Sequence, residues 1–483
     1  MTRLSRANLN NGAAVCPQGE GRESTSTFPA YLAYKTSRVE WVEALPAHWG
    51  KVALKWVSRI FAGGTPDKTK THYWENGSIP WLNSGSVNQV LISEPSAFIT
   101  TEAFNSSSAR WIPPGSLVMA LAGQGKTKGM VAQLAIRTTC NQSMAAITPI
   151  GNVKPRYLFW WLSSNYQNIR NMAGGDLRDG LNLELIGDIP TPMPSEEEQT
   201  QISRFLDHET ARIDALIEEQ QSLIELLKEK RQAVISHAVT KGLDPTVPVK
   251  DSGVEWLGEV PAHWAVSPLK FLVEEKVAGP YGASLTKAMY TNSGYRVYGQ
   301  QHVISDDFSI GDYYISEEKF GEMQRYVVFP GDVLVSVMGT IGRVSVVPIG
   351  VEVGIINPRL VRYKFSSGKV VPEFVKILLM SLRYQSRLRE ESQGSTMEGL
   401  NMVILGDLPL VLPPLDVQHS IVTFVKNSDS NFNELVSQAT WTVDLLQERR
   451  SALVSAAVTG KIDIRGWQPS ASVPTPELAQ EAV

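Results

Sequence analysis

Two groups of polar and basic residues follow glycine-rich turns in the first half of the chain, and their side chains could bind phosphates or base edges. The first group follows the turn at residues 63–66, and the second occupies a glycine-punctuated loop after a β-type apolar run. Lysine can bind a phosphate or the acceptor atoms of guanine, and glutamine suits adenine. The candidates are Lys68, Lys70, Tyr73 and Trp74 in the first group, and Gln124, Lys126, Thr127 and Lys128 in the second.

The second half of the chain offers a similar set in corresponding stretches. We expect these side chains also to lie on loops that face a polyanion or its bases. The candidates are Tyr281, Lys287, Gln300, Gln301 and His302 in the earlier stretch, and Thr340 and Arg343 in the later loop.

No group of residues makes a convincing catalytic or metal site. Gly125-Lys126-Thr127 resembles the end of a phosphate-binding P-loop, but position 120 is Ala where that motif requires Gly. The chain has no Asn/Asp-Pro-Pro-aromatic tetrapeptide of the kind that adenine methyltransferases use, and its seven histidines lack metal-ligand spacing. Two cysteines, Cys16 and Cys140, cannot form a disulfide framework or a zinc site unaided. We therefore expect no catalytic residue, metal or cofactor in this chain.

The sequence segments that should position these candidate residues occur twice in the chain. Val39-Glu40-Trp41 with Pro46-Ala47-His48-Trp49 returns as Val254-Glu255-Trp256 with Pro261-Ala262-His263-Trp264. Further matches follow in the same order, such as Asn141 with Asn357 and the Gly-Leu-Asn at 180–182 with that at 399–401, and the offset grows only from 215 to 219 residues. The chain is thus a tandem repeat of a unit of roughly 215 residues. Residues 58–110 and 274–325 share little, which predicts one frame that presents two different surfaces.

Each repeat begins with a mixed part and ends with a helical part. The first part is rich in Gly, Pro, Ser and aromatic residues, with β-type runs at 116–121 and 333–337 and helical stretches near 156–171 and 373–389. We expect an α+β fold in which each repeat supplies one globular mixed domain and one long helix, and the two long helices can pack on each other.

The helical part of the first repeat runs from 195 to 239 without Gly or Pro, and Ser195 with Glu198 has the spacing of a capping box. Apolar residues recur by sevens in both copies, as in a coiled coil. At 1.5 Å per residue, 45 residues make a helix on the order of 65 Å long. The residues expected to pack helix on helix are Leu206, Ile213, Leu216, Leu223, Leu227, Val234, Val425, Phe432, Leu435, Leu446 and Leu453.

Composition narrows the class of protein. Apolar residues make up 43% of the chain and charged residues 19%, as in globular proteins. No apolar leader or run of about eighteen apolar residues is present, so we expect a cytoplasmic protein without a membrane span. The net charge of −4 is unusual for a free-standing DNA-binding protein, since phosphate neutralisation supplies much of the affinity. Positive charge must then be local or come from partners.

From about Tyr34 to Asp463 the chain resembles the specificity subunits of type I restriction-modification systems, the HsdS family. The resemblance rests on 254–261 with His263-Trp264, on Gly63-Gly64-Thr65-Pro66 with Tyr73-Trp74, on Pro330-Gly331-Asp332, and on the helix end at 448–463. It implies two target recognition domains that each bind one half of a split, asymmetric DNA site. It also implies that two long antiparallel coiled-coil helices separate the domains, with an internal pseudo-twofold relation between the repeats. The chain would be non-catalytic, and its long helices would dock methyltransferase subunits.

The same resemblance implies the other components. The partners would be double-stranded DNA, two methyltransferase subunits and restriction or translocase subunits, and these subunits would bring S-adenosylmethionine and ATP with Mg²⁺. The implied domains are an arm at 1–33, recognition domains at 34–195 and 246–414, long helices at 196–245 and 415–463, and a tail at 464–483. A self-contained methyltransferase or nuclease, and a coiled-coil scaffold that does not bind DNA, are the alternatives.

Overall fold

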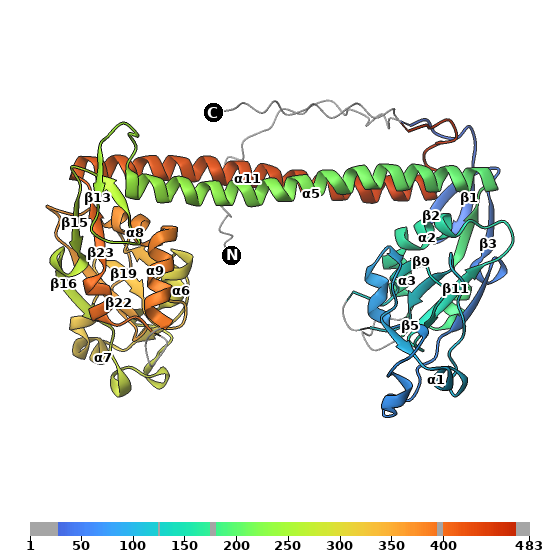
Figure 1. Cartoon of the computed structure of the whole chain (residues 1–483), viewed down its shortest axis with the longest axis horizontal. Helices are drawn as coiled ribbons and strands as arrows, with labels where there is room; N and C mark the ends of the chain where they lie inside the picture. Colours follow the sequence, from blue (N-terminus) through green and yellow to red (C-terminus); the bar gives the residue numbers. More distant parts are fainter. Residues whose placement is uncertain (1–27, 124–125, 174–179, 394–398, 470–483) are drawn as a thin grey trace, which may run out of the picture. The chain divides into compact units, whose positions relative to one another are not determined.

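The computed structural model describes residues 28–123, 126–173, 180–393 and 399–469. The chain forms two compact units: unit 1 comprises Met1–Ile217 with Asp444–Val483, and unit 2 comprises Glu218–Val443. Each unit combines sheets and short helices with part of both long helices, α5 (Glu196–Lys241) and α11 (Leu415–Val458) (Figure 1). The content of helix and sheet agrees with the expected α+β class.

Unit 1 contains a five-stranded sheet with the order β4-β11-β8-β9-β6 and a three-stranded sheet with the order β10-β5-β7. The pairs β1-β2 and β3-β12 complete its strands. Their bounds are β1 (Tyr34–Val39), β2 (Val42–Pro46), β3 (Gly50–Ala53), β4 (Ser58–Ala62), β5 (Ile79–Leu82), β6 (Leu91–Ile92), β7 (Ala97–Ile99), β8 (Leu117–Ala120), β9 (Val131–Leu134), β10 (Thr139–Cys140), β11 (Met144–Pro149) and β12 (Pro190–Met193). The helices are α1 (Thr101–Asn105), α2 (Pro155–Ser164), α3 (Tyr166–Asn171) and α4 (Leu183–Gly187).

Unit 2 has a similar plan, with a four-stranded sheet in the order β16-β22-β19-β20 and a three-stranded sheet in the order β18-β17-β21. The pairs are β13-β14 and β15-β23. The bounds are β13 (Val249–Asp251), β14 (Glu259–Pro261), β15 (Ala265–Pro268), β16 (Val273–Ala278), β17 (Tyr295–Tyr298), β18 (Tyr314–Ile315), β19 (Val333–Ser336), β20 (Val344–Val346), β21 (Gly354–Ile356), β22 (Leu360–Phe365) and β23 (Pro409–Leu412). The helices are α6 (Gln300–Ser305), α7 (Glu317–Glu322), α8 (Pro372–Met380), α9 (Leu382–Gln393) and α10 (Met402–Asp407).

The predicted β runs form the central strands of the larger sheets. All four residues of β8 are buried, and so are all four residues of β19. A strand buried on both faces reads as a continuous apolar run, which is how both were found in the sequence. The helical stretches predicted near 156–171 and 373–389 are each broken once, at Asn165 and at Ser381. Both residues cap one short helix and precede the next, so each stretch forms two helices.

The repeated Gly-Leu-Asn motif caps a short helix in each unit. The side chain of Asn182 accepts a hydrogen bond from the Leu185 N–H (2.8 Å), at the start of α4. In the same way Asn401 accepts from the Ile404 N–H (2.8 Å), at the start of α10. A side-chain oxygen at the N-cap satisfies a backbone donor that has no partner inside the helix, which explains why this motif is written twice.

The N-terminus of α5 is fixed by the predicted capping box. The Glu198 N–H donates to Ser195 Oγ (3.2 Å), and the Ser195 N–H donates to Glu198 Oε2 (3.2 Å). Glu198 also accepts hydrogen bonds from Tyr31, His48 and Trp49, so this one carboxylate joins three segments of unit 1. Val417 stands at the matching position of unit 2, where among the described residues the buried Trp264 Nε1 has no hydrogen-bond partner.

The long helices lie side by side and antiparallel within each unit (Figure 1). Leu206, Ile213 and Val425 are buried, and the other positions spaced by seven, Leu227, Val234, Phe432, Leu446 and Leu453, are half-buried. The second row of the seam differs from the prediction. Leu216, Leu223 and Leu435 are 45%, 42% and 46% exposed. Their neighbours Ile217, Ile224 and Val436 are the half-buried residues, because the seam steps by four residues where three were assumed.

A matched pair of arginines joins the two helices across this seam. In unit 1 Arg450 forms a two-pronged ion pair with Asp214 (Nε–Oδ1 2.7 Å, Nη2–Oδ2 3.2 Å). In unit 2 Arg231, which occupies the equivalent position of the repeat, pairs with Asp429 (Nε–Oδ1 2.8 Å). Each helix thus provides one arginine to the other at corresponding positions, which favours one register of the pair.

The described parts of the predicted flexible termini are folded. Tyr31 and Ile464 are buried in the core of unit 1, and Trp467 packs against that core. Residues 28–33 and 464–469 are therefore part of the folded unit, and 1–27 and 470–483 lie outside the described residues. Aromatic contacts explain the difference, because Trp467 and Phe28 both pack edge-on against Phe205 of α5.

Candidate nucleic-acid interface

Several strands of unit 1 end at one edge of its sheets. β5 and β10 run parallel and finish side by side at Leu82 and Cys140. β4 and β8 are both antiparallel to β11, so they finish where β11 begins, at Ala62 and Ala120. The loops that follow these four strands therefore gather in one place. We call this the loop edge of unit 1, and its described residues are 63–65, 83–84, 121–123 and 141–143.

Unit 2 builds the same edge from equivalent strands. β17 and β21 are parallel and end at Tyr298 and Ile356. β16 and β19 are both antiparallel to β22, and they end beside its first residue, Leu360. The loop edge of unit 2 comprises 279–281, 299–300, 337–340 and 357–359.

The two loop edges share a frame of backbone hydrogen bonds. Four N–H donors of unit 1 have a counterpart in unit 2 that donates to the equivalent carbonyl, with lengths of 2.8–3.1 Å in both. The pairs, donor to acceptor, are Gly63 to Met144 and Gly279 to Leu360; Asn141 to Leu82 and Asn357 to Tyr298; Leu121 to Ser143 and Val337 to Arg359; and Leu181 to Leu121 and Leu400 to Val337. The backbone at the edge is therefore equivalent in the two units.

Glycine is required where the first loop leaves its strand. A Cβ on Gly63 would lie 2.1 Å from the carbonyl oxygen of Cys140, and one on Gly279 would lie 1.9 Å from that of Asn357. No side chain fits such a close approach of two backbones. Gly63 and Gly279 thus allow the backbones of the loop edge to come close together.

The side chains on the two frames differ in size and charge. Thr65, Ser84 and Ser143 in unit 1 stand where unit 2 has Tyr281, Gln300 and Arg359. The loop after β8 is also longer, with five residues between Gly123 and Gly129 where unit 2 has two between Gly339 and Gly342. Lys126 belongs to that longer loop, and its carbonyl accepts the hydroxyl of Tyr166 (2.5 Å).

The structure brings several predicted residues to the loop edges. Tyr281, Gln300 and Thr340 lie on the edge of unit 2, and Arg343 follows it as an exposed residue. Lys126 and Thr127 lie just beyond the edge of unit 1, whereas Gln124 falls outside the described residues. Lys68, Lys70, Lys287 and Gln301 are exposed, and Trp74 is half-buried, on neighbouring loops and helices.

Three of the predicted DNA-contacting residues are buried. Tyr73, Lys128 and His302 are only 5%, 5% and 1% exposed. Tyr73 belongs to a small aromatic core, and Lys70 donates to its hydroxyl (3.1 Å). These side chains have almost no surface to offer a ligand, which corrects the prediction for all three.

His302 has a clear structural task. Its Nδ1 lies 2.9 Å from the N–H of Gly299, and its Nε2 lies 2.9 Å from the carbonyl oxygen of Ile310. Burial lowers the pKa of His302, although contacts of the ring nitrogens with the carbonyl oxygens of Gly299 (3.2 Å) and Ile310 act in the opposite direction. The imidazole caps α6 and ties it to the loop that follows.

Sequence reasoning missed Arg359, the one cationic residue among the described residues that define the two loop edges. Asn357 had been recognised as the repeat of Asn141, and Arg359 stands two residues beyond it. A residue-by-residue comparison past that match would have found the exchange of Ser143 for Arg359. Position in a repeat was the available signal.

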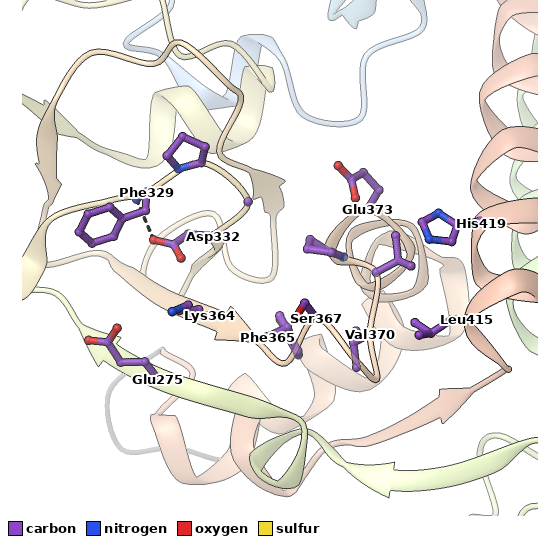
Figure 2. Close-up of a pocket in the computed structure, with 14 residues that line it drawn as sticks. Glu275, Phe329, Asp332, Lys364, Phe365, Ser367, Val370, Glu373, Leu415 and His419 are labelled. Atoms are coloured by element: carbon purple, nitrogen blue, oxygen red, sulfur yellow. Dashed lines mark hydrogen bonds between the residues drawn. The ribbon is translucent and has the colours of Figure 1, made fainter.

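A cavity of about 620 Å³ lies at the opposite end of the unit 2 sheet (Figure 2). β22 begins at the loop edge with Leu360 and reaches this cavity with Phe365. Three carboxylates line the cavity, those of Glu275, Asp332 and Glu373. Burial raises the pKa of Asp332 although Arg362 is beside it. Lys364 also lines the cavity, and Arg362 forms ion pairs with Glu275 and Asp332, so the charges of the cavity are largely compensated within unit 2.

Within the described ranges no group of three or more His, Cys, Asp or Glu is placed to hold a metal ion. The same part of the chain contains no helix that is both long and apolar enough to cross a membrane.

Comparison with known proteins agrees with this architecture. The family model for the type I restriction modification DNA specificity domain matches residues 46–226 and 281–441. The chain is 29% identical over 180 residues to the EcoR124I/EcoR124II specificity subunit of Escherichia coli, covering 36% of this chain and 42% of that relative. It is 22% identical over 319 residues to the MjaVIII specificity subunit of Methanocaldococcus jannaschii, covering 64% and 70%. The first match thus spans less than half of that relative's length.

Solved structures share the fold. A structure described as the basis of complex assembly and conformational transition of the type I R-M system has a TM-score of 0.66 at 17% identity, covering 86% of this chain and 99% of the other. The HsdS subunit from Thermoanaerobacter tengcongensis has a TM-score of 0.53 at 16% identity, covering 86% and 98%. With two copies of the family domain over most of its length, the chain belongs to the family of type I restriction-modification DNA specificity subunits.

Proposed function

We propose that this chain reads a bipartite, asymmetric DNA site on behalf of a type I restriction-modification complex. The observation that supports this best is the pair of loop edges, which share their backbone hydrogen bonds and differ in their exposed side chains. Each base pair presents a distinct set of donors and acceptors in the major groove. Equal frames with unlike side chains would therefore select unlike half-sites, and the whole target would not be palindromic.

In this proposal the target recognition domains are residues 34–195 and 246–414. The long helices, 196–245 and 415–463, act as an antiparallel coiled coil that sets the number of unread base pairs between the half-sites. The matched arginines Arg231 and Arg450 support this role, because they favour a single register of the two helices. The repeat would relate the two domains by a pseudo-twofold axis.

The partners of this chain would include methyltransferase subunits. In unit 2 the long helices expose Leu223, Leu226, Leu435 and Trp441. Exposed apolar side chains on a pair of helices offer surface that a partner protein could cover. We propose that two methyltransferase subunits dock on the helices and that restriction or translocase subunits complete the complex.

The catalytic chemistry would belong entirely to those partners, with S-adenosylmethionine and ATP with Mg²⁺ as their cofactors. The chain itself would be a non-catalytic reader. Its net charge of −4 fits this division, since partner subunits would supply part of the positive charge that holds the DNA.

Exchanging one recognition surface tests the proposal. Residues 58–150 are replaced by the matching segment of a family member with a different target, and methylated adenines are mapped across the genome of cells that carry the whole complex. One half-site should change while the other half-site and the spacer stay the same. The matched control exchanges residues 274–366, which should change the other half-site. A target that changes in both halves would contradict the proposal. So would a purified complex that binds DNA without sequence preference at any salt concentration.

A further inference from the structure

We propose that Arg359 reads a guanine in the half-site recognised by unit 2, and that Gln300 positions its guanidinium. This inference rests on the proposed function and adds a residue and a base to it. The observation behind it is a row of hydrogen bonds at the loop edge, in which the side chain of Gln300 links Arg359 to the loop after β19.

The backbone of Arg359 is held on both sides. Its N–H donates to the side chain of Asn357 (3.0 Å), and its carbonyl accepts the N–H of Val337 (3.0 Å). The Cα of Arg359 therefore has a fixed place beside the end of β19. A fixed backbone reduces the number of directions in which the side chain can point.

The guanidinium is also held. Arg359 Nη1 donates to Gln300 Oε1 (3.3 Å), and Gln300 Nε2 donates in turn to the carbonyl of Met338 and to that of Thr340 (3.4 Å). Gly339, with φ of +72°, lies directly beneath this amide, since a Cβ there would be 3.4 Å from Gln300 Oε1. The loop after β19 thus orients the Gln300 amide, and this amide in turn orients the guanidinium of Arg359.

The remaining donors of Arg359 point to an external ligand. The side chain is exposed, and among the residues that the structure describes no carboxylate forms an ion pair with it. Arginine carries five N–H donors in a planar fork, and Gln300 uses one of them. The free edge of that fork matches N7 and O6 of guanine, the commonest specific contact in the major groove.

The counterpart of Arg359 argues for a base rather than a phosphate. Ser143 occupies the same place in unit 1, with its carbonyl bonded to Leu121 N–H as that of Arg359 is to Val337 N–H. Phosphate contacts carry no sequence information, so two readers on one frame can keep them. Arg359 and Ser143 occupy equivalent backbone positions but differ in side chain. Such a difference is expected where a contact distinguishes one half-site from the other.

The test uses the full chain assembled with its methyltransferase partner and duplexes that carry the mapped target. Each guanine of the unit 2 half-site is replaced in turn by 7-deazaguanine, which lacks the N7 acceptor. For the wild-type complex one such replacement should weaken binding about 5- to 150-fold. R359A should bind the normal and the deaza duplex equally, and its methylation map should become degenerate at that one position.

Three further variants separate the possible roles. R359K keeps the charge without the fork, so it should retain the salt dependence of binding and still lose the guanine preference. Q300A should reduce the preference partly, as expected of a positioning residue. S143A, the matched control in unit 1, should leave the unit 2 half-site unchanged.

Other outcomes overturn the inference. If R359A weakens binding to all duplexes equally and lowers the slope of log affinity against log salt by about 1, Arg359 contacts a phosphate. An unchanged base preference in R359A, or a unit 2 half-site without guanine, also refutes it. If the wild-type complex itself shows no sequence preference, the proposed function fails first, and the two failures are thereby distinguished.

Discussion

Shortening both long helices by one heptad tests whether they set the spacing of the DNA target. The deletions are residues 218–224 of α5 and 436–442 of α11. Both lie between the residues of the two ion pairs, so Arg231–Asp429 and Arg450–Asp214 can still form. Both deletions also keep the alternating steps of three and four residues along the seam, because each removes one complete heptad, the repeat of that seam.

The expected change follows from the helix rise. Seven residues at 1.5 Å shorten the pair by about 10.5 Å. At 3.4 Å per base pair this is about 3 base pairs. DNA turns by roughly 100° over that length, so we expect weaker activity together with the shorter spacer.

The assay is a genome-wide map of methylated adenines in cells that carry the altered complex. The recognised half-sites should stay the same, and their separation should fall by about 3 base pairs. Inserting one heptad at the same places should lengthen the spacer by a similar amount. A variant that still methylates the original target with its original spacing would refute the reasoning.

Deleting the heptad from α5 alone is the matched control. This change would slide one helix along the other, so Arg231 and Arg450 could not both reach their partners, Asp429 and Asp214. We expect a less stable protein without a new, well-defined spacing. If that variant gave the same shortened spacer as the double deletion, the paired seam would not be what sets the distance.

Three further predictions concern the ion pairs and the buried carboxylates. A double-mutant cycle of Arg450→Ala and Asp214→Ala should give a coupling free energy of at most about 1 kcal/mol, measured by denaturant unfolding and smaller in high salt, because both groups are partly exposed. Arg362→Ala should lower the free energy of unfolding by about 3–5 kcal/mol, since Arg362 and Asp332 are both only 2% exposed. The double variant Arg362→Met with Asp332→Asn should recover most of that loss, because Asn keeps an acceptor for the Phe329 N–H. Glu198→Gln should cost about 1–3 kcal/mol near pH 7, with the exposed Glu225→Gln as control. Burial raises the pKa of Glu198, but the hydrogen bonds from His48, Ser195 and Trp49 outweigh burial, so the pKa is lowered. The ionised carboxylate therefore stabilises the folded protein above the pKa that Glu198 has in the unfolded chain, and this stabilisation disappears as pH falls through the folded pKa. A constant difference between Glu198→Gln and wild type from neutral to acid pH would contradict this.

The repeat made much of the fold predictable. A strand buried on both faces has to be apolar throughout, and a long helix without Gly or Pro is visible at once, so β8, β19 and α5 were found close to their observed bounds. The exchange of inserts on a repeated frame also predicted two unlike surfaces. These features depend on local sequence, and local sequence was available twice.

The seam of the helix pair was predicted with the wrong phase. Leucine at 216 and isoleucine at 217 are both apolar, and the sequence of one helix does not say which of the two faces its partner. The choice depends on how the two helices are rotated against each other. That rotation is settled by contacts between residues more than 200 positions apart, such as Arg450 with Asp214.

The candidate site was predictable only in part for a similar reason. Tyr73 and His302 look like surface residues in a polar stretch, yet each is enclosed by segments distant in sequence or by the loop that follows it. No motif or periodic pattern in the surrounding sequence marks Arg359. Arg359 is a candidate because three strand ends meet beside it. The pairing of strands that are separated by long loops cannot be predicted from a local sequence pattern.

The division of the chain into units has a consequence for its synthesis. Unit 2 is one continuous segment, whereas unit 1 is assembled from both ends of the polypeptide. Tyr34 near the start donates its hydroxyl to the carbonyl of Gly460, and Val458 and Ile464 belong to the same core as Trp49. Domains ordinarily fold in the order in which the ribosome makes them. All residues of unit 2 have been made once residue 443 is translated, whereas unit 1, although begun first, lacks its part of α11 until later.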